Sequence, residues 1–411
     1  MSLDFLVHRI PLLLTMDPSR DGLGDMHDVS VGFTDGEISY LGPSLQAPKA
    51  KQVIDGRGTI GLPGLVDPHT HSVWAGSRAN EFRRRLAGES YTRILEGGGG
   101  ILSTVAATRA ATKQALDTRL RGRLARMCAR GVTTVEVKSG YGLNPETEAR
   151  MLGVAREAGA ASGPRVTTTF LGAHTLPAEF RNNRDAYVRQ IIDVQLPMCA
   201  PLADSIDVYC DRGAFSLDES KAILAAGQAH KLKVRAHAEQ VEHTGIAATA
   251  AQMGATCVDH LERLDDAGVA ALAQYGTTAV LLPGAQLYLR DTPPPVAKLR
   301  EAGVPMAVGS DLNPGSSPVH DLWACATLAA VLQGLTVEEA LMGITRNAGR
   351  ALGMDDVGWL GSGSVADLVL MRVPPGEPLE PASLIQHLGL PDAAWVFRDG
   401  VPVCSPAEKA R

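Results

Sequence analysis

The sequence predicts an α/β fold: a (β/α)8 barrel of the TIM type joined to a small β-sandwich domain built from both chain ends. Three observations support this fold class. The chain has 411 residues, which is enough for a large core. Its middle part alternates strand-like apolar runs with helical patterns, as parallel α/β folds do. Its two ends instead carry short alternating runs separated by turn signals.

The two ends share the same pattern. An Asp-Gly pair stands between two alternating runs in each of them, at positions 35–36 and 399–400. Such a pair is typical of a β-hairpin turn. Because the two ends of a domain often lie close together, we expect residues 1–62 and 355–411 to form one small β domain. Residues 63–354 then form the barrel.

The middle part contains eight candidate strands. In chain order they read GLVDPH, VTTVEVKS, RVTTTFLGAH, SIDVYCD, KVRAHAEQ, TCVDHLE, TTAVLLPG and PMAVGSD. Helical patterns lie between them; one of these is expected to begin at Pro145, with Asn144 as its N-cap. Eight strand–helix units match a closed barrel. A doubly wound open sheet is the alternative.

Composition limits the possible partners. The net charge of −6 disfavours nucleic acid, because phosphate binding needs a basic face. The arginine-rich run at 117–130 has leucines at helical spacing, so it is interpreted as an amphipathic helix with a solvated arginine stripe. Six cysteines without a C-x-x-C pair, and no secretory signal, indicate a cytoplasmic protein with reduced thiols. The apolar runs are shorter than the roughly 18 residues of a membrane span, so none is expected.

Chemistry-bearing residues follow the predicted strands. Active sites of (β/α)8 barrels lie at the carboxyl ends of the strands. Five of the 11 histidines fall there, together with an aspartate after the last strand: His69, His71, His174, His237, His260 and Asp311. A His-x-His pair on an extended segment points both rings to one side. Together with a third imidazole and a carboxylate, such a pair suits a divalent cation that keeps one position for water.

These motifs resemble a known family. DPHTH after the first strand, a histidine in the fifth and sixth runs and an aspartate after the eighth look like the amidohydrolase superfamily. GSGSVADLVL near the C-terminus resembles the strand by which those chains return to their small β domain. A further set, spanning residues 69–318, is similar to the imidazolonepropionase family within that superfamily: HTHSVWAGSRANEF, EGGGGI, VEVKSGYGL, FLGAH, LLPG and DLNPGSSP.

The resemblance implies roles for individual residues. It implies the metal ligands His69, His71, His237 and Asp311, and catalytic roles for His260 and Asp311, without deciding which of these two carries the proton. It implies substrate contacts from Arg78, Tyr91, Tyr141, His174, Gln240, Asn313, Gly315 and Ser316. The implied reaction is metal-dependent hydrolysis of the cyclic amide of 4-imidazolone-5-propanoate to N-formimidoyl-L-glutamate, in histidine degradation. The expected partners are this small molecule and a second copy of the chain in a homodimer.

The expected metal content is one ion per chain. Several superfamily members hold two metals bridged by a carboxylated lysine at the end of strand four. Here that run ends VYCD, and Lys138 lies on the second run instead. We therefore expect one divalent or trivalent ion, zinc or iron, since imidazole and carboxylate ligands suit both. Lys138 is interpreted as a structural residue or as a charge in the pocket.

Three alternatives remain at this point. A deaminase of the same superfamily typically has a glutamate where this chain has Gln240, whose amide does not carry a proton. A dihydroorotase-like hydrolase would need the missing strand-four lysine. A non-catalytic relative would be expected to lose metal ligands. The glycine run Gly97–Gly100 lacks the G-K-[ST] of a phosphate loop and is interpreted as a mobile loop and a candidate lid.

Overall fold

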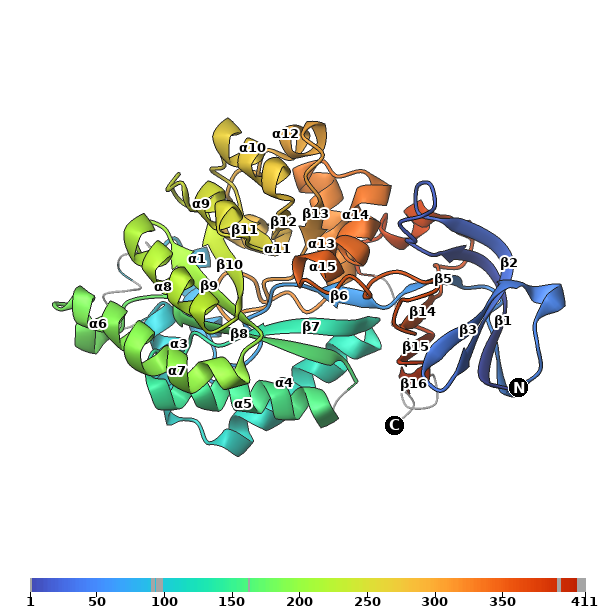
Figure 1. Cartoon of the computed structure of the whole chain (residues 1–411), viewed down its shortest axis with the longest axis horizontal. Helices are drawn as coiled ribbons and strands as arrows, with labels where there is room; N and C mark the ends of the chain where they lie inside the picture. The colour runs from blue at the N-terminus through green and yellow to red at the C-terminus, as the bar shows by residue number, and fades with distance from the viewer. Residues whose placement is uncertain (1, 90–92, 94–98, 162, 390–392, 405–411) are drawn as a thin grey trace.

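The computed structural model describes residues 2–89, 93, 99–161, 163–389 and 393–404. A barrel of parallel strands surrounded by helices lies beside a separate sheet to which both chain ends contribute (Figure 1). The predicted fold class, a (β/α)8 barrel with a β part built from both ends, is confirmed. Within these described ranges, no helix is both long and apolar enough to cross a membrane.

The barrel strands pair in chain order, and all are parallel. They are β6 (Leu65–Asp67), β7 (Val132–Lys138), β8 (Arg165–Ala173), β9 (Ser205–Cys210), β10 (Lys233–Ala238), β11 (Cys257–His260), β12 (Thr278–Leu281) and β13 (Met306–Val308). Each falls within one of the eight predicted runs. Sequential order excludes the doubly wound alternative, in which the strand order reverses. Strand β7 is buried along its whole length, as expected when helices cover a parallel sheet.

The ring closes beyond the ends of its first and last strands. The Asp311 backbone N–H donates to the His69 carbonyl oxygen at 3.0 Å, and the His71 N–H donates to the Leu312 carbonyl oxygen at 3.0 Å. Thr70 and Leu312 form a parallel bridge between these hydrogen bonds. The segments that close the barrel therefore also carry the predicted metal ligands.

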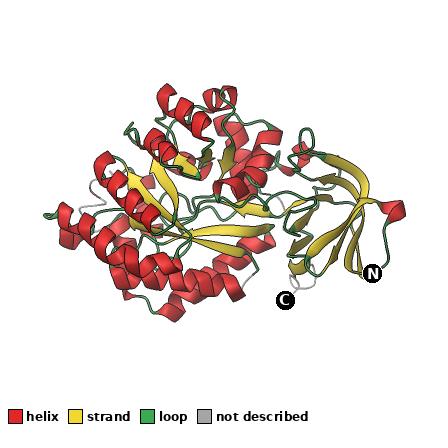
Figure 2. Cartoon of the chain, viewed as in Figure 1, coloured by secondary structure: helices red, strands yellow, loops and turns green. Residues whose placement is uncertain are grey.

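Helices cover the outside of the barrel (Figure 2). They are α1 (Ala79–Leu86), α3 (Ile101–Ala110), α4 (Lys113–Ala129), α5 (Pro145–Ala161), α6 (Arg184–Gln190), α7 (Leu196–Cys199), α8 (Leu217–Ala229), α9 (Ile246–Gln252), α10 (Asp266–Tyr275), α11 (Pro283–Leu289), α12 (Val296–Glu301), α13 (Leu322–Leu328), α14 (Val337–Gly343) and α15 (Arg346–Ala351). Helix α5 begins at Pro145 as predicted. The Asn144 side chain accepts a hydrogen bond from the Thr147 N–H at 2.9 Å, which satisfies one free donor of the first turn.

Helix α4 is amphipathic as predicted, but its arginine stripe is not fully solvated. Arg123 is buried, its guanidinium lies 3.2 Å from the centre of the Trp74 ring, and it donates to the carbonyl oxygens of Ser72 and Trp74. The expectation of a solvated stripe was therefore wrong at this position. The cause is helical spacing: Arg123 is three residues after Leu120 and four before Met127, so it lies on the buried face of α4. There the chain after β6 offers it carbonyl oxygens and an aromatic face.

Both chain ends form one hydrogen-bonded sheet of mixed direction. Its strands are β1 (Leu3–Leu14), β2 (Asp25–Thr34), β3 (Glu37–Pro43), β4 (Ala50–Asp55), β5 (Ile60–Pro63), β14 (Leu368–Met371), β15 (Trp395–Arg398) and β16 (Val401–Cys404). Antiparallel pairing of β5 with β14 joins the two ends. At both predicted turns, Asp and Gly have φ between 50° and 81°, as a two-residue hairpin requires. The boundaries 1–62, 63–354 and 355–411 stay a prediction.

Two glycines of α5 lead to opposite stability predictions. A Cβ atom at Gly153 would meet nothing within 4 Å, whereas one at Gly159 would lie 2.6 Å from the Val166 side chain on β8. Gly153→Ala should raise the free energy of unfolding by about 0.5–1 kcal/mol through helix propensity. Gly159→Ala should lower it by about 1–3 kcal/mol through overpacking. Urea unfolding midpoints measure both; a change of the same sign in the two variants would contradict this account.

Candidate metal centre

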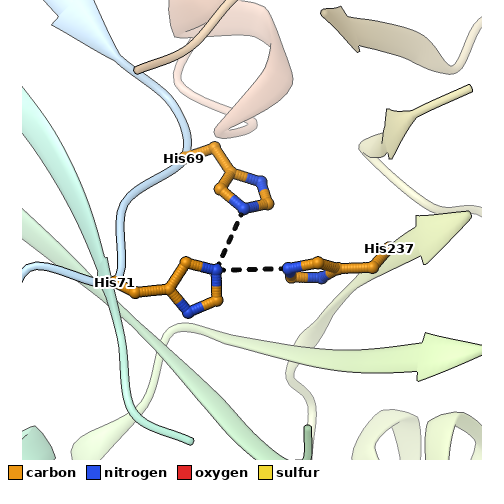
Figure 3. A group of neighbouring side chains, drawn as sticks. All are labelled: His69, His71 and His237. Carbon is orange, nitrogen blue, oxygen red and sulfur yellow. Dashed lines mark hydrogen bonds between the residues drawn. The ribbon is translucent and has the colours of Figure 1, made fainter. Parts of the chain in front are cut away.

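Three imidazoles converge at the carboxyl ends of the barrel strands (Figure 3). The Nε2 atom of His71 lies 3.3 Å from Nε2 of His69 and 3.2 Å from Nε2 of His237. Asp311 approaches the same point, with its Oδ1 atom 3.5 Å from Nε2 of both His69 and His71. All four side chains are buried. The structure thus brings together the four ligands predicted from the sequence.

Buried carboxylates orient two of these rings. His69 Nδ1 lies 2.8 Å from Asp259 Oδ2, and His237 Nδ1 lies 3.1 Å from Asp207 Oδ1. An ionised carboxylate only accepts, so each Nδ1 carries the proton and each Nε2 presents its lone pair to the centre.

The imidazoles of His69 and His71 are held in the neutral form. Burial and the charge of Lys138 hold the pKa of His69 well below its ordinary value. Burial and the neighbouring His174 have the same effect on the pKa of His71. Neutral imidazole is the form that coordinates metals.

This donor set fits a metal ion. Three imidazole nitrogens and one carboxylate oxygen are the ligands of a catalytic zinc or iron site. Burial raises the pKa of Asp311 to about 7, so a cation among the donors would favour its charged form. The Nδ1 atom of His71 has no hydrogen-bond partner among the described residues, so its inward Nε2 makes the polar contacts of this ring.

Lys138 lies behind the imidazoles and is fully buried. Its Nζ atom is 2.8 Å from Asp207 Oδ2 and 2.9 Å from Glu136 Oε1. Burial and the nearby Arg235 lower the pKa of the ammonium, but the surrounding acids outweigh them and the pKa is raised. Lys138 is therefore charged at neutral pH.

The backbone is strained where the site residues follow their strands. Four non-glycine residues there have positive φ: Glu239 (56°), His260 (79°), Leu261 (77°) and Asp311 (49°). Each such conformation costs of the order of 1–3 kcal/mol and persists only where the surroundings hold it. For Glu239, three backbone N–H groups donate to its buried carboxylate, which fixes the turn that carries Gln240.

Aromatic side chains line one side of the centre. His174 stacks on His71 with ring centroids 4.9 Å apart, and its Nδ1 lies 2.9 Å from the Gly140 carbonyl oxygen. The Tyr141 ring is 5.4 Å from that of His174. The loop that carries Tyr141 is held by Glu148, which accepts three backbone hydrogen bonds of 2.7–2.9 Å. On the opposite side, the His260 ring lies 5.4 Å from that of His237.

Arg78 is held by a neighbouring acid. Its Nε and Nη2 donate to the two carboxylate oxygens of Glu81, and Glu81 Oε2 also accepts from the Gly100 N–H at 2.9 Å. A Cβ atom at Gly315 would lie 2.8 Å from Arg78 Nη1, so the guanidinium rests directly against that glycine. The structure thereby connects Arg78 with the loop after β13.

Asn313 uses its side chain to shape that loop. Its Oδ1 accepts from the N–H groups of Gly315 and Ser316 at 2.8 Å, and its Nδ2 donates to the Asp311 carbonyl oxygen at 2.7 Å. A direct substrate contact from Asn313 stays a prediction. Tyr91 lies outside the described residues, as do Gly97 and Gly98 of the predicted lid.

Comparison with known proteins identifies the family. The sequence model described as "Amidohydrolase family" matches residues 83–382. A protein of Shewanella baltica named imidazolonepropionase is 46% identical over 397 residues, covering 94% of this chain and 96% of that protein. One of the same name from Ralstonia nicotianae is 47% identical, covering 95% and 96%. The chain belongs to the amidohydrolase family.

Solved structures agree with an amidohydrolase fold. An adenosine deaminase from Xanthomonas campestris with bound zinc is similar with a TM-score of 0.76 at 18% identity, covering 98% of this chain and 93% of that one. An atrazine chlorohydrolase from Arthrobacter aurescens complexed with zinc has a TM-score of 0.70 at 17% identity, covering 98% of each chain. At these identities the likeness concerns the fold.

Sequence reasoning assigned no role to four residues around this amidohydrolase site. Asp207, Asp259 and Glu81 support the residues described above, and the Tyr209 ring lies 5.7 Å from that of His237. The available signal was period-two alternation: Asp207 and Tyr209 share one face of β9, and a charge inside an apolar strand is uncommon. This alternation was overlooked because only the residues at the strand ends were considered.

Zinc should stabilise the protein through this centre. A ligand that binds the folded state at 100 times its Kd adds about 2.7 kcal/mol. Zinc should therefore raise the thermal midpoint of the metal-free protein, and His71→Ala should remove most of that rise. His27→Ala, an exposed histidine of β2, is the control and should keep it. Equal zinc shifts in His71→Ala and the wild type, measured by calorimetry, would exclude the centre.

Proposed function

We propose that the chain is an imidazolonepropionase, which hydrolyses the cyclic amide of 4-imidazolone-5-propanoate to N-formimidoyl-L-glutamate. The observation that carries the proposal is the similarity of nearly the whole chain to curated relatives of that name, at 45–47% identity. The converging imidazoles and Asp311 support it, because an amidohydrolase of this kind needs a metal.

We assign one zinc or iron ion per chain to His69, His71, His237 and Asp311. When bound, such an ion would lower the pKa of a coordinated water to about 7 and polarise a carbonyl group. A second ion would need a carboxylated lysine as a bridge. Strand β9 has no lysine, and the ammonium of Lys138 is already paired with Asp207 and Glu136, which supports a single ion.

The reaction requires two proton movements. Water adds to the lactam carbonyl carbon, the ring C–N bond breaks, and the departing nitrogen takes a proton, so one water is consumed. Asp311 accepts the proton of the water and passes it to the nitrogen, because its carboxylate lies at the point where the imidazoles meet. His260 donates to the carbonyl oxygen, and the Glu262 carboxylate lies nearby, with its Oε1 atom 3.9 Å from His260 Nδ1.

The remaining assigned residues recognise the substrate. Arg78 binds the propanoate through the edge of its guanidinium that carries Nη1, because Glu81 occupies the opposite edge. Tyr141, His174 and Gln240 surround the ring, and Gly315, Ser316, Asn313 and Tyr91 complete the contacts. Gln240 does not carry a proton, which disfavours a deaminase. We also propose, from the sequence alone, a homodimer in the cytoplasm.

Freshly prepared imidazolone propanoate tests the function. Metal-loaded protein should remove its ultraviolet absorbance and yield a product heavier by one water, without ammonia. A chelator should stop turnover, and zinc or iron should restore it. Ammonia release would indicate a deaminase instead, and an unchanged substrate would rule out the assigned reaction.

Arg78→Met should weaken use of this substrate at least about tenfold, mainly through KM. A hydrogen bond to a charged group is worth about 1.5–3 kcal/mol, and 1.4 kcal/mol corresponds to about tenfold. The matched control is Arg83→Met; Arg83 is an exposed arginine of helix α1, which follows Arg78, and it donates to Asn80. Steady-state kinetics of the three proteins decide; an Arg78→Met variant with the KM of the control would refute the carboxylate role.

A further inference from the structure

We propose that Lys138 is a positioning residue, which fixes two metal-binding imidazoles through the carboxylates of Asp207 and Asp259. The inference rests on the metal site assigned under the proposed function. It concerns a residue that touches neither the substrate nor the ion.

The contacts form a branched relay, in which Lys138 reaches His237 through Asp207 and His69 through Asp259. The Asp207 carboxylate lies between Lys138 and His237. Its Oδ2 is 2.8 Å from the Lys138 ammonium, its Oδ1 accepts from the His237 backbone N–H at 3.2 Å, and both oxygens lie 3.1 Å from His237 Nδ1. Lys138 on β7 thereby fixes a carboxylate on β9, which fixes a ring on β10.

The second branch reaches His69. Asp259 Oδ2 lies 2.8 Å from His69 Nδ1 and 3.7 Å from Lys138 Nζ. The guanidinium of Arg235 lies 3.6 Å from the same oxygen and donates to the Pro68 carbonyl oxygen at 2.6 Å. Among the described residues, Asp259 thus pairs with two basic side chains, Lys138 and Arg235, whereas Asp207 pairs with Lys138 and otherwise with His237 itself. The His237 branch therefore depends more strongly on Lys138.

Charge alone would predict the opposite effect on metal binding. Two cations, Lys138 and Arg235, face three buried acids, Glu136, Asp207 and Asp259, which leaves one net negative charge behind the imidazoles. Removing Lys138 makes the net charge behind the imidazoles more negative by one, and simple attraction would then bind a cation more tightly. If Lys138 positions the carboxylates, its loss releases Asp207 and weakens the metal site. The sign of the change in affinity separates the two roles.

The test compares zinc affinity in full-length variants. Lys138→Met and Lys138→Gln are measured by competition with a chelator, with Lys113→Met as control; Lys113 is an exposed lysine that pairs with Glu157 on the surface. Residues that orient metal ligands typically change affinity by about 10–100-fold. We expect at least a tenfold loss in the Lys138 variants and no loss in the control. Unchanged or tighter zinc binding would overturn the proposal.

A second readout separates positioning from general support of the fold. Nitrogen-15 spectra of the metal-free wild type should show His237 protonated at Nδ1, and the folded Lys138 variant should show a mixture of tautomers. The zinc losses of Lys138→Gln and Asp207→Asn should also be non-additive, since both act on one ring. Additive losses or an unchanged tautomer would contradict the relay. These measurements use no substrate, so their outcome does not depend on whether the assigned reaction is correct.

Discussion

The candidate site depends on two buried hydrogen bonds between imidazoles and carboxylates. Asp259 and Asp207 accept hydrogen bonds from the Nδ1–H groups of His69 and His237, which leaves both Nε2 lone pairs directed at one point. Without these carboxylates, a buried ring could expose either nitrogen. The rings therefore converge because β9 and β11 hold Asp207 and Asp259 behind them. The catalytic role assigned to Asp311 relies on this convergence.

Burying these charged groups is costly, and the fold offsets the cost by pairing them. A buried charge without a partner destabilises a protein by several kcal/mol, whereas a paired and hydrogen-bonded one is tolerated. Lys138, Arg235 and the acids between them satisfy this condition. The strained residues His260 and Asp311 lie immediately above the same layer. The strain and the buried charges lower the stability of the fold, but they hold the side chains in one arrangement before a ligand binds. This is the general basis of preorganised sites.

Much of this arrangement could be predicted from the sequence. The eight barrel strands were found because each is a short apolar run followed by a helical pattern. The ligands were found because polar residues end those runs, and because the motifs resemble a known family. Asp207 and Asp259 were given no role because a charge within a strand becomes informative only when the inward face of that strand is known. Arg123 was misjudged because its charge was taken as a sign of exposure, although its spacing from Leu120 and Met127 puts it on the buried face, where carbonyl oxygens and the Trp74 ring receive it.

The backbone pairing of residues 69–71 with 311–312 limits how this protein could evolve. A substitution that moved one of these strand extensions to accept another metal geometry would also break the hydrogen bonds that close the barrel. Variation in substrate choice is therefore expected elsewhere, in peripheral loops such as those bearing Tyr141 and Ser316. Within such a lineage, the ligand spacing would be inherited with the architecture, while the chemistry around it diversifies.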